Sequence, residues 1–409
     1  MLCKTVTRYV VQGKYALTLQ DCFNVRGYDS TLGFVSFIGR KAEANAPLVD
    51  ILLELGAVIY VKTNIPQTLM SADSDNNVFG RVLNPHNISP TAGGSSGGEG
   101  ALIAMRGSIL GIGTDIAGSI RIPALCCGTF GFKPTAGRIP FAGQTSAERN
   151  GSPGIQASAG PLATSFRDLR LLMQTVLDAQ PWDRDPAVLP VAWRSVQKHG
   201  RLTIGIISEV SNYPLRPPVR RAIKEATTIL SKAGHTVTVL QATPSILEAG
   251  MLAFKLLTLD NTRTALRHIQ ASGEPPIRSL AGSVPDLTGP QSTLEDLFDF
   301  NAKKADIAAR WHQVWLDNQL DAIIMPGHSN TASPHDTYGQ PPCTLLWNLI
   351  DWPACIIPYG KVDRSLDEVD GYDTNLHIEA PCAIQVVGRR FQDEQLLAVT
   401  DIIRGDLAK

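Results

Sequence analysis

The chain has 409 residues, a formal net charge of −1 and 44% hydrophobic residues, a balance typical of globular proteins with a substantial core. A charge this close to zero argues against a nucleic-acid partner, because phosphate contacts need a concentrated basic face. The seven cysteines include no C-x-x-C pair, which argues against a disulfide framework or a zinc site and favours a cytoplasmic location. No apolar run has the length of a membrane span or of a signal-peptide core.

The first half of the chain alternates between helical and strand patterns. Pro47 begins an apolar periodic stretch that Gly56 ends, which predicts a helix. The apolar residues 57–61 then predict a buried strand, and the pair forms a helix–strand unit of an α/β fold. Ser165 is expected to cap a further helix whose inner face carries Phe166, Leu169, Met173 and Leu177.

The second half continues in the same manner. Helices are predicted at residues 218–233, closed by Gly234, and at 293–317. Short apolar strands are predicted at residues 202–207, 237–240, 322–325, 354–357 and 383–387. Residues 263–294 have no clear pattern; a surface loop is favoured over a substrate-access insertion. No break in composition marks a linker, so we expect one domain over residues 1–409.

The first chemically informative segment is Ala92-Gly93-Gly94-Ser95-Ser96-Gly97-Gly98-Glu99-Gly100. A flexible linker is unexpected here, because the segment leads directly into apolar residues. Gly94–Gly98 formally fits the G-x-S-x-G nucleophile elbow, but that motif requires a preceding strand. Pro85 and Pro90 disfavour a central strand at that place. A phosphate-binding loop is also excluded, because no G-K-[ST] follows.

The second informative segment is Leu110-Gly111-Ile112-Gly113-Thr114-Asp115-Ile116-Ala117-Gly118-Ser119-Ile120-Arg121-Ile122-Pro123. It lacks the remaining glycines and the acidic residue of a dinucleotide-binding motif. Small residues directly before Ser119 allow successive backbone N–H groups to converge beside its hydroxyl. That arrangement is typical of an oxyanion hole.

Together with Gly128-Thr129-Phe130-Gly131-Phe132-Lys133-Pro134-Thr135, these segments resemble the amidase signature family. The resemblance is nearly continuous over residues 20–138 and weaker over the rest. The stretches at residues 27–33 and 63–67 look most like its acetamidase and fatty-acid amide hydrolase branch.

The resemblance implies a Ser–Ser–Lys mechanism without cofactor or metal. By motif position Ser119 is the nucleophile that forms the acyl-enzyme, and Ser95 relays the proton. Ile116, Ala117, Gly118 and Ser119 would direct backbone N–H groups at the oxyanion, with Thr114 beside them. The lysine of this mechanism is the base, since a serine hydroxyl needs a neighbouring base to become a good nucleophile. We expect the hydroxyls of Ser95 and Ser119 to lie about 2.6–3.2 Å apart or slightly further.

The sequence departs from the family at the lysine that serves as base, because Gln20 stands at that position. We expect Gln20 to point at Ser95 from a strand. A glutamine amide can donate a hydrogen bond there, but it cannot accept a proton. Lys62 and Lys133 belong to motifs that are structural in the family, and Lys14 is roughly 20 Å away along an extended strand. None of the three is an expected substitute.

Two further departures concern Ala117 and the start of the chain. The family usually has glycine at the position of Ala117; if that position requires a positive φ, a Cβ costs roughly 1–2 kcal/mol. Only 19 residues precede Gln20, so the domain is expected to be truncated at its N-terminus.

The sequence therefore predicts a single α/β domain, with a large mixed sheet flanked by helices. The expected function is hydrolysis of a small or lipophilic carboxamide through an acyl-serine. The alternative is a catalytically impaired homologue that acts as a binding protein or is a non-functional truncated copy. The expected partner is a small amide substrate, with no membrane span; a homodimer is left open.

Overall fold

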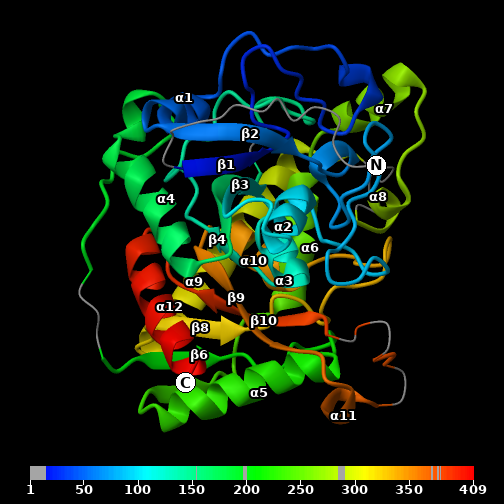
Figure 1. Ribbon diagram of the computed structural model, residues 1–409. Helices are drawn as coiled ribbons and strands as arrows, with labels where there is room; N and C mark the ends of the chain where they lie inside the picture. The colour runs from blue at the N-terminus through cyan, green and yellow to red at the C-terminus, as the bar shows by residue number, and fades with distance from the viewer. Residues whose placement is uncertain are drawn as a thin grey trace.

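The computed structural model describes residues 15–152, 154–196, 200–283, 291–369, 372–374, 377 and 379–409. Ten strands within these ranges form one mixed sheet in the order β2-β1-β3-β5-β4-β9-β10-β8-β6-β7 (Figure 1). The strands, in chain order, are β1 (Tyr15–Gln20), β2 (Ala57–Thr63), β3 (Leu110–Asp115), β4 (Phe130–Lys133), β5 (Ser158–Ala163), β6 (Thr203–Ile206), β7 (Thr236–Val239), β8 (Ala322–Met325), β9 (Ala354–Lys361) and β10 (Pro381–Val387). The three strands at each end are parallel, and antiparallel pairs join the centre.

Helices flank both sides of this sheet. They are α1 (Pro47–Glu54), α2 (Gly97–Ala104), α3 (Arg121–Cys127), α4 (Phe166–Asp178), α5 (Pro217–Lys232), α6 (Ile246–Leu257), α7 (Thr264–Ser272), α8 (Arg278–Ser283), α9 (Leu294–Asp317), α10 (Pro342–Leu349), α11 (Arg364–Asp367) and α12 (Asp393–Leu407), with the short 3-10 helices η1 (Val35–Phe37), η2 (Gln67–Leu69) and η3 (Pro181–Asp183). Buried residues of α1, α4, α5 and α12 share one apolar cluster on one side of the sheet. Helices α2 and α3 pack on the other side, and α6, α9 and α10 form a further apolar layer.

Alternation places Thr18 and Gln20 of β1, together with Gly111 and Gly113 of β3, on the side of α2. Leu17, Leu19 and Ile112 enter the apolar cluster with α1 and α4. Thr18 and Gln20 therefore point to the opposite face, because successive side chains of a strand alternate. In the register, Thr18 pairs with Gly111 and Leu19 with Ile112. This face carries the residues that the sequence predicts to be functional.

Most predicted elements are confirmed within a few residues of their expected bounds. Helix α1 begins at Pro47, and α9 begins after Thr293 with a capping box to Asp296. Strand β8 has the predicted bounds, whereas β9 extends beyond them to Lys361. The inner face of α4 is buried as expected.

Three expectations are wrong. Strand β2 is half-buried rather than buried, because it lies at the edge of the sheet. Ser165 precedes α4 but makes no side-chain capping bond. The expected surface loop at residues 263–294 contains two helices in its described part, α7 and α8. Ile269, Ile277 and Leu280 pack into the core and stabilise these helices, which the sequence pattern alone does not show.

Candidate active site

Gln20 lies at the end of β1 and is fully buried. Its Oε1 accepts hydrogen bonds from the backbone N–H of Thr114 at 2.7 Å, from Thr114 Oγ1 at 3.1 Å and from Ser96 Oγ at 2.9 Å. A backbone N–H can only donate, so this contact fixes the orientation of the amide group. Nε2 consequently donates to Ser95 Oγ at 3.3 Å. The prediction that Gln20 points at Ser95 from a strand is confirmed.

The loops that carry Ser95 and Ser119 lie against each other. The backbone N–H of Ser96 donates to the carbonyl of Ser119 at 3.1 Å, and both serine side chains are largely buried. The predicted direct contact is not formed, however: in the described part of the chain no hydrogen bond joins the two hydroxyls. Ser95 Oγ instead accepts from Gln20, which leaves its own proton free for another acceptor.

The turn before Ser119 presents free backbone donors. The N–H groups of Ile116, Ala117 and Ser119 donate to no group among the described residues. The N–H of Gly118 is engaged instead, because it donates to Asp115 Oδ1 at 2.8 Å. Three N–H groups therefore remain that can converge on a developing oxyanion.

Glycine is required at position 118, and not at position 117. Gly118 has φ of +127°, and a Cβ on it would meet Thr344 Oγ1. Ala117 is not among the described residues with positive φ, so its methyl group carries no backbone strain. Its carbonyl accepts a hydrogen bond from Thr344 Oγ1 at 2.7 Å, which ties the turn to the start of α10.

Asp115 and Arg121 stabilise the backbone of this turn. Asp115 accepts from the N–H groups of Gly118 and Ile120, on either side of Ser119. Burial alone would raise the pKa of Asp115, but the charge and hydrogen bonds of Arg121 bring its pKa below the usual value. Arg121 also bonds the side chains and backbone of a buried network that sequence reasoning missed: Thr344, Asn348 and Gln385.

A buried carboxylate lies next to the site, on α2. Glu99 accepts from Thr18 Oγ1 at 2.5 Å and from Thr63 Oγ1 at 2.7 Å. Gly111 makes room for it, because a Cβ there would collide with Glu99 Oε2. Burial raises the pKa of Glu99 to about 7, although the two threonines act in the opposite direction. Nothing in the sequence pattern distinguishes this glutamate from an ordinary residue in the first turn of a helix.

Lys62 and Lys133, the lysines considered as substitute bases, make their hydrogen bonds to groups other than Ser95 and Ser119. Lys62 Nζ donates to Asp29 O at 2.6 Å and to Ser30 Oγ at 2.7 Å. Lys133 Nζ donates to Pro134 O at 3.0 Å. Burial lowers the pKa of both, opposed by Asp21 for Lys62 and by Asp351 for Lys133. Lys14 lies outside the described residues. Gln20, and no lysine of the described chain, is hydrogen-bonded to Ser95.

An apolar surface adjoins the oxyanion turn. Met70, Ile116 and Ala117 are only partly buried, and all three pack against the apolar cluster built from α6, α9 and α10. Met70 also contacts the cluster on the other side of the sheet. The oxyanion turn therefore has an apolar neighbourhood.

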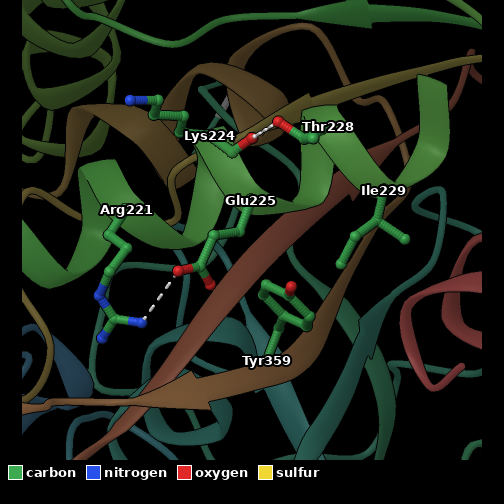
Figure 2. Close-up of a pocket in the computed structure, with 6 residues that line it drawn as sticks. All are labelled: Arg221, Lys224, Glu225, Thr228, Ile229 and Tyr359. Atoms are coloured by element: carbon green, nitrogen blue, oxygen red, sulfur yellow. Dashed lines mark hydrogen bonds and ion pairs between the residues drawn. The ribbon is translucent and has the colours of Figure 1, made fainter. Parts of the chain in front are cut away.

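A separate groove of about 380 Å³ lies over α5, lined by Arg221, Lys224, Glu225, Thr228, Ile229 and Tyr359 (Figure 2). It contains none of the predicted site residues. Among the residues that the structure describes, no group of three or more His, Cys, Asp and Glu side chains is arranged to hold a metal ion. None of the described helices is both long and apolar enough to cross a membrane.

Comparison with known proteins agrees with this geometry. The profile of the Amidase family matches residues 16–397. An amidase of Gibberella moniliformis (strain M3125 / FGSC 7600) is 38% identical, over 96% of this chain and 74% of its own length. An acetamidase of Emericella nidulans is 34% identical, over 94% and 75%. A solved fatty acid amide hydrolase superposes with a TM-score of 0.93 at 30% identity, over 97% of this chain and 73% of its own.

The fold and the paired serine loops define a hydrolase of carboxamide C–N bonds, and the chain belongs to the amidase family. Its relatives extend beyond the matched part, since the chain spans about three quarters of their length.

Proposed function

We propose that this amidase cleaves carboxamides through an acyl-enzyme on Ser119, with Ser95 as proton relay and Gln20 as the donor that orients Ser95. The observation that carries the proposal is the hydrogen bond from Gln20 Nε2 to Ser95 Oγ. Gln20 donates to Ser95 in this contact and does not accept its proton. The Ser95 proton is therefore free to be donated to another group.

The proton transfers balance without a separate base. As Ser119 Oγ attacks the carbonyl carbon, its proton passes to Ser95 Oγ, and the Ser95 proton passes to the leaving nitrogen. The amine departs. Water then attacks the acyl-serine, its proton passes to Ser95 Oγ, and the Ser95 proton passes to Ser119 Oγ as the carboxylic acid leaves. The free N–H groups of Ile116, Ala117 and Ser119 stabilise the tetrahedral oxyanion. Substrate must bring the two hydroxyls together, as catalytic hydrogen bonds often tighten only in the complex.

We assign the substrate to small or lipophilic carboxamides. The support is the partly buried apolar residues Ile116 and Ala117 of the oxyanion turn, which pack with Met70 against one apolar cluster. Relatives that are named acetamidase and fatty acid amide hydrolase bracket this range. A charged acyl group would lose its hydration there without an ionic partner.

A fluorophosphonate probe tests the proposal, because it reacts with an activated serine. We expect stoichiometric labelling of Ser119 in the purified protein, located by peptide mass spectrometry, and none in Ser119→Ala. Ser95→Ala should label at least about tenfold more slowly, since relay groups are typically worth 10²–10⁴ in rate. If Ser119 stays unlabelled while the protein is folded, the binding-protein alternative replaces this proposal.

We also propose a cellular location and an oligomeric state. The six described cysteines are buried and unpaired, which supports a cytoplasmic location; a fluorescent fusion that enters the secretory pathway would contradict it. A homodimer is the remaining assembly expectation, and sedimentation velocity of the purified chain decides between one and two copies.

A further inference from the structure

Helices α7 and α8, with the turn between them, form an arm over residues 264–283 that docks on η1. The His268 ring makes edge contacts with Phe34 and Phe37, at centroid distances of 5.4 and 4.7 Å. Ser36 Oγ donates to the carbonyl of His268 at 2.8 Å. Its buried apolar residues make the arm a packed part of the fold. Figure 1 shows α7 at the upper right and α8 below it.

One carboxylate in the turn of the arm gathers four donors. Glu274 Oε1 accepts from the Val35 N–H at 2.8 Å and from Ser272 Oγ at 3.0 Å. Its Oε2 accepts from Gln67 Nε2 at 2.8 Å and from Asn77 Nδ2 at 2.9 Å. Two of these donors are side-chain amides from a loop about 200 residues away in sequence, so Glu274 joins distant segments.

The Gln67 side chain makes hydrogen bonds to several groups of the arm. Its side chain is completely buried, its Oε1 accepts from the Ile277 N–H at 3.0 Å, and its Nε2 also reaches Pro275 O at 3.3 Å. The backbone N–H of Gln67 donates to Asp75 O at 2.8 Å. Both ends of the amide are thus used, and a change in Glu274 must disturb Gln67.

The residues that follow Gln67 have a strained backbone. Thr68 has φ of 75° and Leu69 has φ of 65°. Positive φ is rare for any residue with a Cβ and a clear outlier for a β-branched one. Such conformations persist only where the surroundings enforce them. The bonds from the arm to the Gln67 side chain hold this segment together with the backbone bond from Thr68 N–H to Leu32 O at 3.2 Å.

This strained loop leads directly to the active site. The carbonyl of Ser71 and the backbone of Ala72 lie so close to Gly94 that a Cβ on Gly94 would collide with them. Met70 packs against the same apolar cluster as Ile116 and Ala117 of the oxyanion turn. Residues 68–72 therefore form a wall of the site, called here the 68–72 wall.

We propose that Glu274 is a positioning residue that holds the 68–72 wall through Gln67, so that the α7–α8 arm determines how well the site accepts long apolar acyl groups. The inference rests on the proposed function of Ser119. Glu274 lies outside the catalytic machinery and acts through the wall. When Glu274 loses its charge, Gln67 and Asn77 face an amide with only one acceptor oxygen, and the wall relaxes.

The decisive variants exchange the groups of this contact. In Glu274→Gln the NH₂ group of the new amide can face the amide donors of Gln67 and Asn77. The double variant Glu274→Gln with Gln67→Glu restores one carboxylate and one amide across the contact. Glu43→Gln is the charge-matched control, because Glu43 is exposed and outside the arm. Should Glu274→Gln fail to fold, Glu274→Asp keeps the charge and shortens the reach.

The readout compares second-order labelling of Ser119 by a methyl and a dodecyl fluorophosphonate. In Glu274→Gln we expect the dodecyl-to-methyl rate ratio to fall about tenfold, as when some two methylene groups lose apolar contact. The methyl rate should stay within about twofold. Hydrogen exchange at residues 67–72 should accelerate in the same variant, and the double variant should recover both properties.

The alternatives give different results. A ratio equal to that of wild type and Glu43→Gln, with Ser119 still labelled, overturns the role of Glu274. An equal fall of both rates indicates general destabilisation and overturns it as well. A wild-type protein that neither probe labels refutes the proposed function, and hydrogen exchange at residues 67–72 then decides separately whether Glu274 holds the wall.

Discussion

Asp115 and Arg121 form an ion pair in which both side chains are completely buried, with 2.9 Å between Asp115 Oδ1 and Arg121 Nη2. The same carboxylate accepts the N–H groups of Gly118 and Ile120. Because those residues flank Ser119, the ion pair fixes the backbone that presents the nucleophile. Arg121 in turn is held by backbone and side-chain oxygens of α10 and β10.

Asp115→Asn should therefore be strongly destabilising. Removing one partner leaves Arg121 buried without its counter-charge, and such losses are typically about 3–5 kcal/mol. Urea unfolding measures this free energy. Glu54→Gln, which breaks the exposed pair with Arg184, should cost less than about 1 kcal/mol. Equal costs for the two variants would show that the buried pair does not stabilise the turn.

Gln20→Lys should raise amide hydrolysis more than ester hydrolysis. The lysine amine supplies the missing base, and general-base assistance is typically worth about 10²–10⁴ in rate, or roughly 3–5.5 kcal/mol of barrier. An activated ester gains less, because its leaving group needs no proton. Steady-state kinetics on a matched amide and p-nitrophenyl ester test this, with Ser119→Ala as the blank. Robust wild-type amide turnover that Gln20→Lys does not improve would contradict the missing-base argument.

Gly118→Ala and Ala117→Gly should have opposite consequences although the positions are adjacent. At Gly118 the added methyl meets Thr344 and the backbone has positive φ, so we expect a loss of at least roughly 1–2 kcal/mol and slower labelling of Ser119. At Ala117 the backbone is unstrained, and glycine should change stability by less than about 1 kcal/mol. Thermal unfolding and probe labelling measure both. A tolerated Gly118→Ala would contradict the described turn.

Glu99→Gln should change the pH dependence of stability. The pKa of Glu99 is raised from 4.5 to about 7 in the folded protein, so the folded state holds an extra proton between these values. The free energy of unfolding therefore falls as the pH rises through that window, by about 3 kcal/mol at most. Glutamine keeps both contacts, because Thr18 and Thr63 can either donate or accept.

The check on Glu99 is urea unfolding of wild type and Glu99→Gln at several pH values from 4.5 to 8. The variant should be more stable than wild type at pH 8 and match it near pH 4.5. Glu43→Gln, which removes an exposed carboxylate, should follow the wild-type curve. Parallel curves for wild type and Glu99→Gln would contradict the raised pKa.

The sequence by itself determined the elements whose signals are local. Pro47 and Gly56 bound α1 because proline suits the first helical turn and glycine the left-handed residue that ends it. The Gly/Ser-rich segments likewise indicated the two loops that meet at Ser96 and Ser119. The resemblance to the amidase signature family placed Gln20 on a strand facing Ser95.

Only the tertiary structure decided the features that depend on distant partners. Helices α7 and α8 form because their apolar residues find the core near Phe34 and Phe37. Arg121, next to the oxyanion turn, is bound by Thr344, Asn348 and Gln385, which are 223, 227 and 264 residues away in sequence. Glu99 acquires its raised pKa from burial beneath Gly111. In each case the cause is a contact or a desolvation across the fold, which no local pattern of residues encodes.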